Sequence, residues 1–333
     1  MSAVSRYNRQ RGVAIIMAML IVALATSVAA YAAWQQNLWI RQSQNLGAQA
    51  QALAVSRAAI YFGKKVLLND LANSNPPNVD DLKEDWAKYS LTEPIEGGSV
   101  SGKIADQQGL FNVNNLAATN PIEQALQRKW FDALLANLSL PAELAVALQD
   151  YVDLDDQGPK EDLAYLGKSE PYRTANQPIY GIDELYRVEG FDEKIIAALK
   201  PFITAIPNLT PPAQGSSTPT VTPTPLNVNT APKEILEAVF PGNGAQIETL
   251  RKNAAFKDFT DFQTATSNLL GQPNPQNPAA YPWSQTTIAA KSDYFLVAAA
   301  SQFGTTKIGL VALVQRVNAN DWPTIVWQKQ TLD

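Results

Sequence analysis

The chain has 333 residues, 46% hydrophobic and 17% charged, so its length allows two or three domains of roughly 100–200 residues each. It contains no His and no Cys, which excludes Ser/His/Asp and Cys/His catalysis, thiolate or imidazole metal sites, and disulfides. With 26 Lys and Arg against 31 Asp and Glu, the net charge of −5 disfavours a polyanionic partner such as nucleic acid. Calcium, which prefers oxygen ligands, is not excluded.

The amino-terminal segment combines a basic leader with a long apolar run. Residues 1–12 carry three arginines and no acid, and residues 13–33 are apolar except for two hydroxyl side chains and one tyrosine. At 1.5 Å per residue, a helix of this length crosses roughly 30 Å of hydrocarbon. Because the arginines precede the run, the positive-inside rule places the amino terminus in the cytoplasm and the rest of the chain on the opposite side.

The junction between leader and apolar run reads RQRG/VAIIMAML over residues 9–20 and resembles a type IV prepilin signal. The resemblance implies that prepilin peptidase cleaves between Gly12 and Val13, and that the retained helix begins with a methylated Val13. Loss of the three leader arginines would change the net charge from −5 to −8. A plain signal anchor, which is not cleaved, is the alternative.

Most prepilin-like proteins carry Glu at the fifth mature position, where this chain has Met17. A carboxylate inside the bilayer is costly unless a partner satisfies it, and in pilins that partner is the terminal amine of the subunit ahead. A subunit without this carboxylate needs no subunit ahead of it. In this respect the chain resembles the K minor pseudopilins of type II secretion systems, which implies a place at the pseudopilus tip.

Patterns further along the chain are similar to a pilin fold. A helical pattern without proline continues to about residue 72, and the two prolines of NSNPPN end it. Near the carboxyl terminus, three runs rich in β-branched and aromatic residues predict an antiparallel meander. The predicted fold class is α+β: a pilin-like fold with a long N-terminal transmembrane helix and an antiparallel sheet, interrupted by a large, mainly helical inserted domain.

The predicted boundaries follow changes in composition. Strands are expected at 294–301, 307–317 and 324–329, and inserted helices near 121–137, 141–151, 182–199 and 233–240. In chain order the units are a leader (1–12), a long helix (13–72, transmembrane over 13–33), the first part of the pilin-like domain (73–118), an inserted helical domain with an acidic loop and a helix-hairpin-helix-like unit (119–206), an exposed Pro/Thr-rich linker (207–226), a second helix-hairpin-helix-like segment (227–285) and the C-terminal strands (286–333).

Two echoing segments, FNVNNL at 111–116 and LNVNTA at 226–231, each precede a predicted helix and occur in the K pattern. We interpret their Asn and Thr side chains as helix caps, which accept hydrogen bonds from free backbone donors. These residues are therefore expected to be structural.

The stretch from 147 to 192 resembles the most specific part of the K family. Residues 150–162 hold six acids against one lysine, a density that repels itself unless water or a cation neutralises it. The segment begins like an EF-hand loop but has Ala164 where that loop needs a bidentate Glu. A solvent-facing acidic loop is one interpretation. The family resemblance instead implies calcium, and it assigns as ligands Asp153, Asp155, Glu161 and Asp162.

Two segments, 182–202 and 227–262, resemble helix-hairpin-helix units, which in DNA-binding proteins place hairpin amides against a phosphate. Their net charges of −2 and −1 lack the basic flanks of such proteins. A membrane-anchored DNA receptor of the competence type is the alternative function. A membrane-anchored calcium-dependent hydrolase lacks any nucleophile motif.

The combined resemblance predicts a minor pseudopilin that supports export of folded proteins across the outer membrane and is not an enzyme. It implies single-pass anchoring in the bacterial inner membrane with the carboxyl-terminal domain in the periplasm. The expected partners are other minor pseudopilins, of the I and J types, together with prepilin peptidase as the processing enzyme. The secretin and secreted substrates are further expected contacts, and nucleic acid is not expected as a partner.

Overall fold

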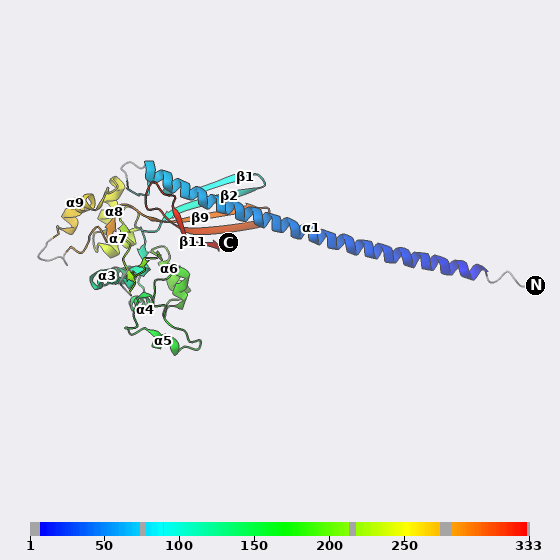
Figure 1. The fold of residues 1–333 in the computed structure, drawn as a ribbon, viewed down its shortest axis with the longest axis horizontal. Coiled ribbons are helices and arrows are strands. Elements are labelled where there is room, and N and C mark those ends of the chain that lie inside the picture. The colour runs from blue at the N-terminus through cyan, green and yellow to red at the C-terminus, as the bar shows by residue number, and fades with distance from the viewer. Residues whose placement is uncertain (1–6, 74–77, 89, 213–217, 274–280, 332–333) are drawn as a thin grey trace, which may run out of the picture.

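The computed structural model describes residues 7–73, 78–88, 90–212, 218–273 and 281–331 (Figure 1). A long helix, α1 (Tyr7–Asn73), projects from a head that gathers the rest of the chain around its carboxyl-terminal end. The first part of the predicted leader, residues 1–6, lies outside the described residues.

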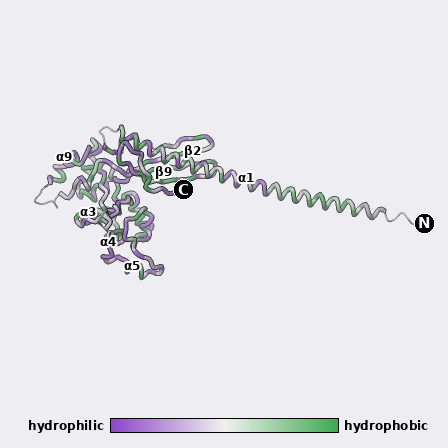
Figure 2. The backbone as a smooth tube through the Cα atoms, in the orientation of Figure 1, coloured by the Kyte–Doolittle hydropathy of each residue, from purple (hydrophilic) through white to green (hydrophobic). Residues whose placement is uncertain are grey.

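α1 is one continuous helix of 67 residues, which is about 100 Å at 1.5 Å per residue. Its amino-terminal half has no protein around it, and Ile15, Leu20 and Leu24 are each more than 60% exposed. Figure 2 shows this half as an apolar rod. Within the described ranges, α1 is the one helix long and apolar enough to cross a membrane, as predicted.

The carboxyl-terminal half of α1 packs on a five-stranded antiparallel sheet with the strand order β1-β2-β9-β10-β11. The strands are β1 (Ser90–Ile95), β2 (Gly98–Asp106), β9 (Tyr294–Phe303), β10 (Thr306–Gln315) and β11 (Thr324–Thr331). The last three form the predicted meander. β1 and β2 form a hairpin that the sequence patterns did not resolve.

Close packing holds α1 against the sheet. Residues of β9 alternate between the two faces, and Phe295 and Val297 share a buried core with Ile60 of α1. A Cβ at Gly63 would lie 2.6 Å from Val297 Cγ1, so the absence of a side chain at Gly63 allows this approach. The helix and the sheet therefore form one unit.

The inserted domain occupies residues 107–293, between two neighbouring strands of the sheet. Its entry and exit lie side by side, because Asp106 at the end of β2 pairs in register with Phe295 at the start of β9. The domain has a core separate from the one beneath α1. Its helices are η1 (Val113–Ala117), α3 (Pro121–Asn137), α4 (Glu143–Val152), α5 (Asp162–Leu166), η2 (Ile182–Arg187), α6 (Glu193–Leu199), α7 (Lys233–Val239), α8 (Gly244–Asn253) and α9 (Phe259–Leu270), while α2 (Asp85–Lys88) precedes the sheet.

One expectation for the inserted domain agrees with the structure and another differs. The predicted helical run at 182–199 consists of η2 and α6, and Gly190 between them, with a φ of +85°, forms the turn of the predicted helix-hairpin-helix-like unit. The Pro/Thr-rich segment forms a short hairpin, β5 (Leu209–Thr210) with β6 (Thr220–Val221), and its ends pack on the domain. Val221 is buried, and its backbone exchanges hydrogen bonds with Thr119 at 3.0 and 2.7 Å.

The two echoing Asn segments build the same local structure twice. The strands β3 (Phe111–Asn112) and β7 (Leu226–Asn227) pair in parallel with β4 (Ile203–Thr204) and β8 (Ile288–Ala289), respectively. In each copy the first Asn accepts a hydrogen bond from the backbone of the second. The second, Asn114 or Asn229, is buried and donates its amide to two backbone carbonyls. The predicted role as a helix cap is confirmed for Asn112, which caps η1, but not for the second segment, because α7 begins after Pro232 without a side-chain cap.

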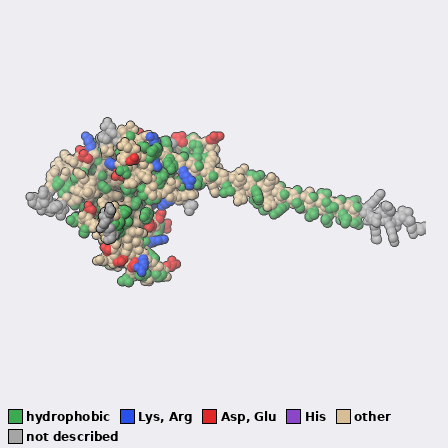
Figure 3. All heavy atoms as spheres, viewed as in Figure 1, with side chains coloured by type: hydrophobic (Ala, Val, Ile, Leu, Met, Phe, Trp, Pro, Cys, Tyr) green, Lys and Arg blue, Asp and Glu red, His purple; other side chains and the backbone are tan. Residues whose placement is uncertain are grey.

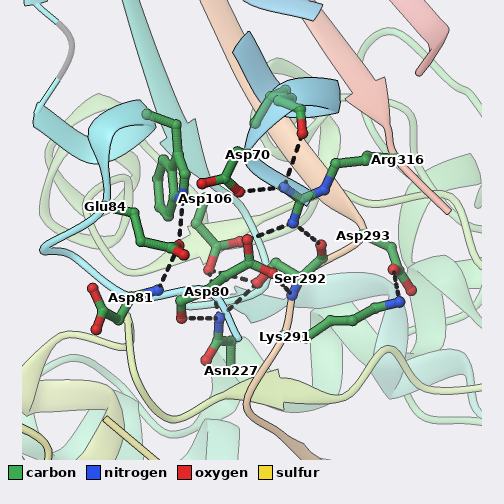
Figure 4. Close-up of polar contacts among 12 residues, drawn as sticks. Asp70, Asp80, Asp81, Glu84, Asp106, Asn227, Lys291, Ser292, Asp293 and Arg316 are labelled. Atoms are coloured by element: carbon green, nitrogen blue, oxygen red, sulfur yellow. Dashed lines mark hydrogen bonds and ion pairs between the residues drawn. The ribbon is translucent and has the colours of Figure 1, made fainter. Parts of the chain in front are cut away.

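A buried arginine joins the end of α1 to the sheet (Figure 4). Arg316, directly after β10, is 1% exposed and pairs with Asp80 and, at 2.8 Å, with Asp70 of α1. Its guanidinium also donates to the carbonyls of Leu67 at 3.2 Å and Ser292 at 3.1 Å. One side chain therefore ties together α1, the segment after it and both ends of the β9–β10 hairpin.

A second buried acid joins the sheet to the inserted domain. Asp106 accepts hydrogen bonds from Thr230 Oγ1 and, at 2.7 Å, from Ser292 Oγ, and burial raises the pKa of Asp106 to about 6. Asn227 of β7 donates its amide to Ser292 Oγ at 2.8 Å and to the carbonyl of Asp80 at 3.1 Å. We call this set the junction network, and its members are Asp70, Asp80, Asp106, Asn227, Thr230, Ser292 and Arg316.

We expect Arg316→Met to lower the free energy of unfolding by about 3–5 kcal/mol, because Asp80 is then a buried charge without its partner. Denaturant unfolding of the full chain in detergent, followed by tryptophan fluorescence, measures the loss. The control is Arg128→Met, since Arg128 pairs with Asp132 near the surface, where such pairs contribute about 1 kcal/mol or less. Equal losses in the two variants would show that the junction network does not hold the head together.

Candidate functional site

The predicted processing site lies on the exposed part of α1. Gly12 and Val13 are both exposed, and a Cβ at Gly12 would meet no atom within 4 Å. Met17 is 64% exposed and presents a thioether on the apolar surface of α1. The bond between Gly12 and Val13 therefore lies within the first turns of α1, and no described residue of the head covers it.

The acidic loop runs from α4 to α5 and brings three carboxylates together. Asp150 lies in the last turns of α4, Asp153 follows that helix directly, and Glu161 is the residue before α5. One oxygen from each carboxylate lies within 4.8 Å of the other two. All three residues are buried, with 5–6% of their surface exposed.

These carboxylates lack the partners that buried charges need. Asp153 Oδ1 and Glu161 Oε1 have no hydrogen-bond partner among the described residues. Burial, together with the smaller effect of the neighbouring acids, raises the pKa of Asp153 to about 7 and that of Glu161 to about 7. Asp150 accepts one hydrogen bond, from the backbone N–H of Lys160 at 2.7 Å. The group therefore combines excess negative charge with buried acceptors that have no donor.

A divalent cation with oxygen ligands fits this group. Calcium lies about 2.3–2.6 Å from its ligands, so oxygens that share one ion lie within about 5 Å of one another. The three carboxylates meet this spacing, and a cation would satisfy the two unpaired oxygens. A donor set made of carboxylate oxygens suits calcium better than zinc or iron.

Two of the four predicted ligands lie outside this group. Asp155 is exposed, and its Oδ1 accepts from the backbone N–H of Gln157 within the loop. Asp162 pairs with Arg173 at 2.7 Å and accepts from the backbone and the hydroxyl of Thr174 at 3.0 Å. The structure thus brings the other two predicted ligands, Asp153 and Glu161, together with Asp150, which was not predicted as a ligand.

Asp150 is the acid that the sequence interpretation did not select. Its spacing of three residues from Asp153, at the end of a helical pattern, was the available signal, because residues three apart lie on one side of a helix. The loop closes tightly over it: a Cβ at Gly158 would lie 2.4 Å from the Asp150 carboxylate. Lys160 then fixes the loop to Glu189 through an ion pair of 2.8 Å.

A second group of acids, Asp70, Asp80 and Glu84, has oxygens equally close together but is already satisfied. Arg316 pairs with the first two, and Glu84 accepts from Trp86 Nε1 at 2.8 Å (Figure 4). Burial raises the pKa of Asp70 to about 6 and that of Glu84 to about 7. This group is part of the structural junction between α1 and the sheet.

The second helix-hairpin-helix-like unit, α7 and α8, binds its own carboxylate where a DNA-binding hairpin binds a phosphate. Glu237 accepts from the backbone N–H of Gly242 and, at 3.0 Å, from that of Gly244. The hairpin amides are therefore occupied, and the acid repels phosphate. Figure 3 shows acidic and basic side chains interspersed over the visible face of the head. The DNA receptor is not favoured.

Comparisons with known proteins agree with this arrangement. A family model described as type II secretion system protein K matches residues 109–208. The chain is 31% identical to type II secretion system protein K of Pseudomonas aeruginosa, over 92% of this chain and 89% of that protein. It is 28% identical to type II secretion system protein K of Klebsiella pneumoniae, over 93% of both.

A solved structure shares the fold. It is the GspK-GspI-GspJ complex of the type 2 secretion system from enterotoxigenic Escherichia coli, and one of its chains matches with a TM-score of 0.72 at 24% identity. The match covers 88% of this chain and all of that chain, which confirms the pilin-like α+β fold with its inserted domain. The Pseudomonas relative is similar over nearly the whole length. The chain therefore belongs to the type II secretion system protein K family and is a minor pseudopilin of that system.

Proposed function

We propose that this minor pseudopilin is anchored in the bacterial inner membrane by α1, with its amino terminus in the cytoplasm and its head in the periplasm, and that it caps the pseudopilus. Prepilin peptidase cleaves it between Gly12 and Val13, and Val13 is then methylated. From the tip, the head contacts secreted substrates and the secretin and so supports export of folded proteins across the outer membrane.

The observation that carries this proposal is an exposed apolar helix joined to a head that is enlarged at its far end. In Figure 1 the inserted domain lies at the end of the head away from the amino terminus. A subunit stacked ahead in a filament would need that space. Met17 supports the same position, because it offers no carboxylate to the amine of a subunit ahead.

The proposed partners are minor pseudopilins of the I and J types. The structural relative was solved as a complex of GspK with GspI and GspJ. In this chain, a groove of about 450 Å³ runs between α1 and β2, and Phe62 at its edge is 52% exposed. Apolar surface of this kind, outside the membrane segment, favours packing against another helix.

Calcium is the ion proposed for the acidic loop. Asp150, Asp153 and Glu161 would hold it, while the other two predicted ligands, Asp155 and Asp162, have partners of their own outside this group. The bound ion supplies the positive charge that lets the three carboxylates ionise together. The chain's own residues then fix the path of the loop between α4 and α5, which is a structural role.

Amino-terminal sequencing tests processing. Protein from membranes of cells with prepilin peptidase should begin at a methylated Val13, as intact mass also shows. Gly12→Leu should keep the leader and stop secretion, because the peptidase needs the small residue before the cleaved bond. Gly47→Leu is the matched control, since Gly47 is equally exposed on α1 with no atom within 4 Å of a Cβ. An intact leader on the wild type, beside correctly processed pseudopilins, would make the protein a plain signal anchor.

Without calcium, the head should lose stability as the pH rises from about 4 to about 7. Asp153 and Glu161 ionise at their ordinary pKa of about 4 in the unfolded chain but at about 7 in the folded chain. The folded state therefore holds protons that the unfolded state releases, and the stability that this provides at low pH is lost as the pH passes the folded pKa. Melting temperatures in chelator at about pH 5 and about pH 7.5 measure the loss.

Calcium should raise the melting temperature at about pH 7.5 and have little effect at about pH 5, because protons compete for the same oxygens. Asp153→Asn should reduce both the pH-dependent loss and the gain from calcium. Glu170→Gln, which changes an exposed acid outside this group, should keep both. An undiminished gain from calcium in Asp153→Asn would contradict the proposed site.

A further inference from the structure

One side of α1, beyond the membrane segment, carries cations beside exposed aromatic rings. Arg57, Tyr61, Lys64 and Lys65 follow each other at spacings of three, four, seven and eight residues, which places them on one side of a helix. Trp322, in the turn between β10 and β11, lies against the two lysines. We call these five residues the basic stripe.

The aromatic rings of the basic stripe frame its ammonium groups. Lys64 Nζ lies 4.9 Å from the centre of the Tyr61 ring and 5.8 Å from that of Trp322, and Lys65 Nζ lies 5.8 Å from the same Trp322 ring. Tyr61 and Trp322 are 58% and 55% exposed. Lys64 is 8% exposed, and burial lowers its pKa. An anion that reached Lys64 would therefore have to lie against both rings.

The three cations of the basic stripe have no ion pair with any described residue. The single acid of α1, Asp70, is bound to Arg316. Asp321, next to Trp322, instead accepts a hydrogen bond from the Asn318 amide through its carboxylate, and its backbone N–H donates to Asn318 Oδ1. Cations without an ion-pair partner among the described residues, in a chain of net charge −5, form a positively charged surface that an acidic partner complements.

The distance of the basic stripe from the membrane excludes anionic lipid headgroups as its partner. Lys64 is separated from Ala33, the end of the apolar run, by about 45 Å of helix. The field of anionic lipids decays over a Debye length of about 8 Å, so headgroups cannot reach the basic stripe. A second copy of this chain does not fit either, because its α1 carries no acid besides Asp70.

We propose that the basic stripe docks a helix of a different pilin-like subunit, through carboxylates spaced three or four residues apart and flanked by apolar side chains. This inference rests on the proposed function, which places other pilin-like subunits beside α1. It adds that the cations of the basic stripe select the subunit whose helix carries carboxylates. Helices that pack side by side align side chains at these spacings. Carboxylates at such positions meet Arg57, Lys64 and Lys65 in turn, while the apolar side chains cover Tyr61 and Trp322.

The test uses the full chain, co-expressed with the I- and J-type minor pseudopilins of its own system. Arg57→Glu/Lys65→Glu reverses two exposed cations of the basic stripe, and Lys129→Glu/Lys194→Glu makes the same change on the inserted domain. We expect the first variant to recover about tenfold less partner protein and the second to match the wild type, since like charges across an interface oppose binding. High salt should weaken recovery by the wild type, because it screens exposed charges.

A photo-reactive phenylalanine in place of Tyr61 gives a second measurement that does not depend on charge reversal. We expect its crosslink in a partner helix that carries acids three or four residues apart. Full recovery of partners by the basic-stripe variant, equal losses in both double variants, or a crosslink to a segment without acids would each overturn the proposal. Failure of the wild type to recover either partner would instead overturn the proposed function.

Discussion

The buried pair of Arg316 and Asp80 is the contact on which the rest of the architecture depends. Both residues are 1% exposed, so each charge requires the other, and Arg316 also reaches α1 through Asp70 and the carbonyl of Leu67. Arg316 therefore fixes the last turns of α1 to the sheet, and the core beneath the helix holds the turns before them. The carboxyl-terminal half of α1 and the sheet thus form one packed unit, to which the inserted domain is joined through Asp106 and Asn227.

The chain treats its two groups of clustered acids in different ways. Around Asp80 an internal arginine supplies the positive charge, and the surrounding donors complete the hydrogen bonds. Around Asp153, no cation in the described part of the chain forms an ion pair with the three carboxylates, and two buried oxygens are left without donors. The first arrangement is complete within the folded chain. The second leaves two buried acceptors unpaired, and this is the observation on which the proposed ion site rests.

Local patterns were sufficient for much of the fold. The apolar run, the meander and the helix at 121–137 follow from periodicity and turn signals that act over a few residues, and the structure has all three. The junction network could not be predicted, because Asp80, Asp106, Asn227 and Arg316 are far apart in the sequence and meet through the fold alone. The same limit applied to the acidic loop: its composition indicated a cation site, but the direction of each side chain separated Asp150 from Asp155 and Asp162.

The neighbouring positions of β2 and β9 have a mechanical consequence. The inserted domain leaves and re-enters the sheet at the same end, through two neighbouring strands. A force transmitted from α1 into the strands therefore does not have to pass through the inserted domain. A force directed along α1 during filament growth would pass into the sheet, where it would load the hydrogen bonds between the strands in shear. A lateral force on the inserted domain, by contrast, would tend to rotate that domain about its two connections to the sheet, next to Asp106 and Phe295.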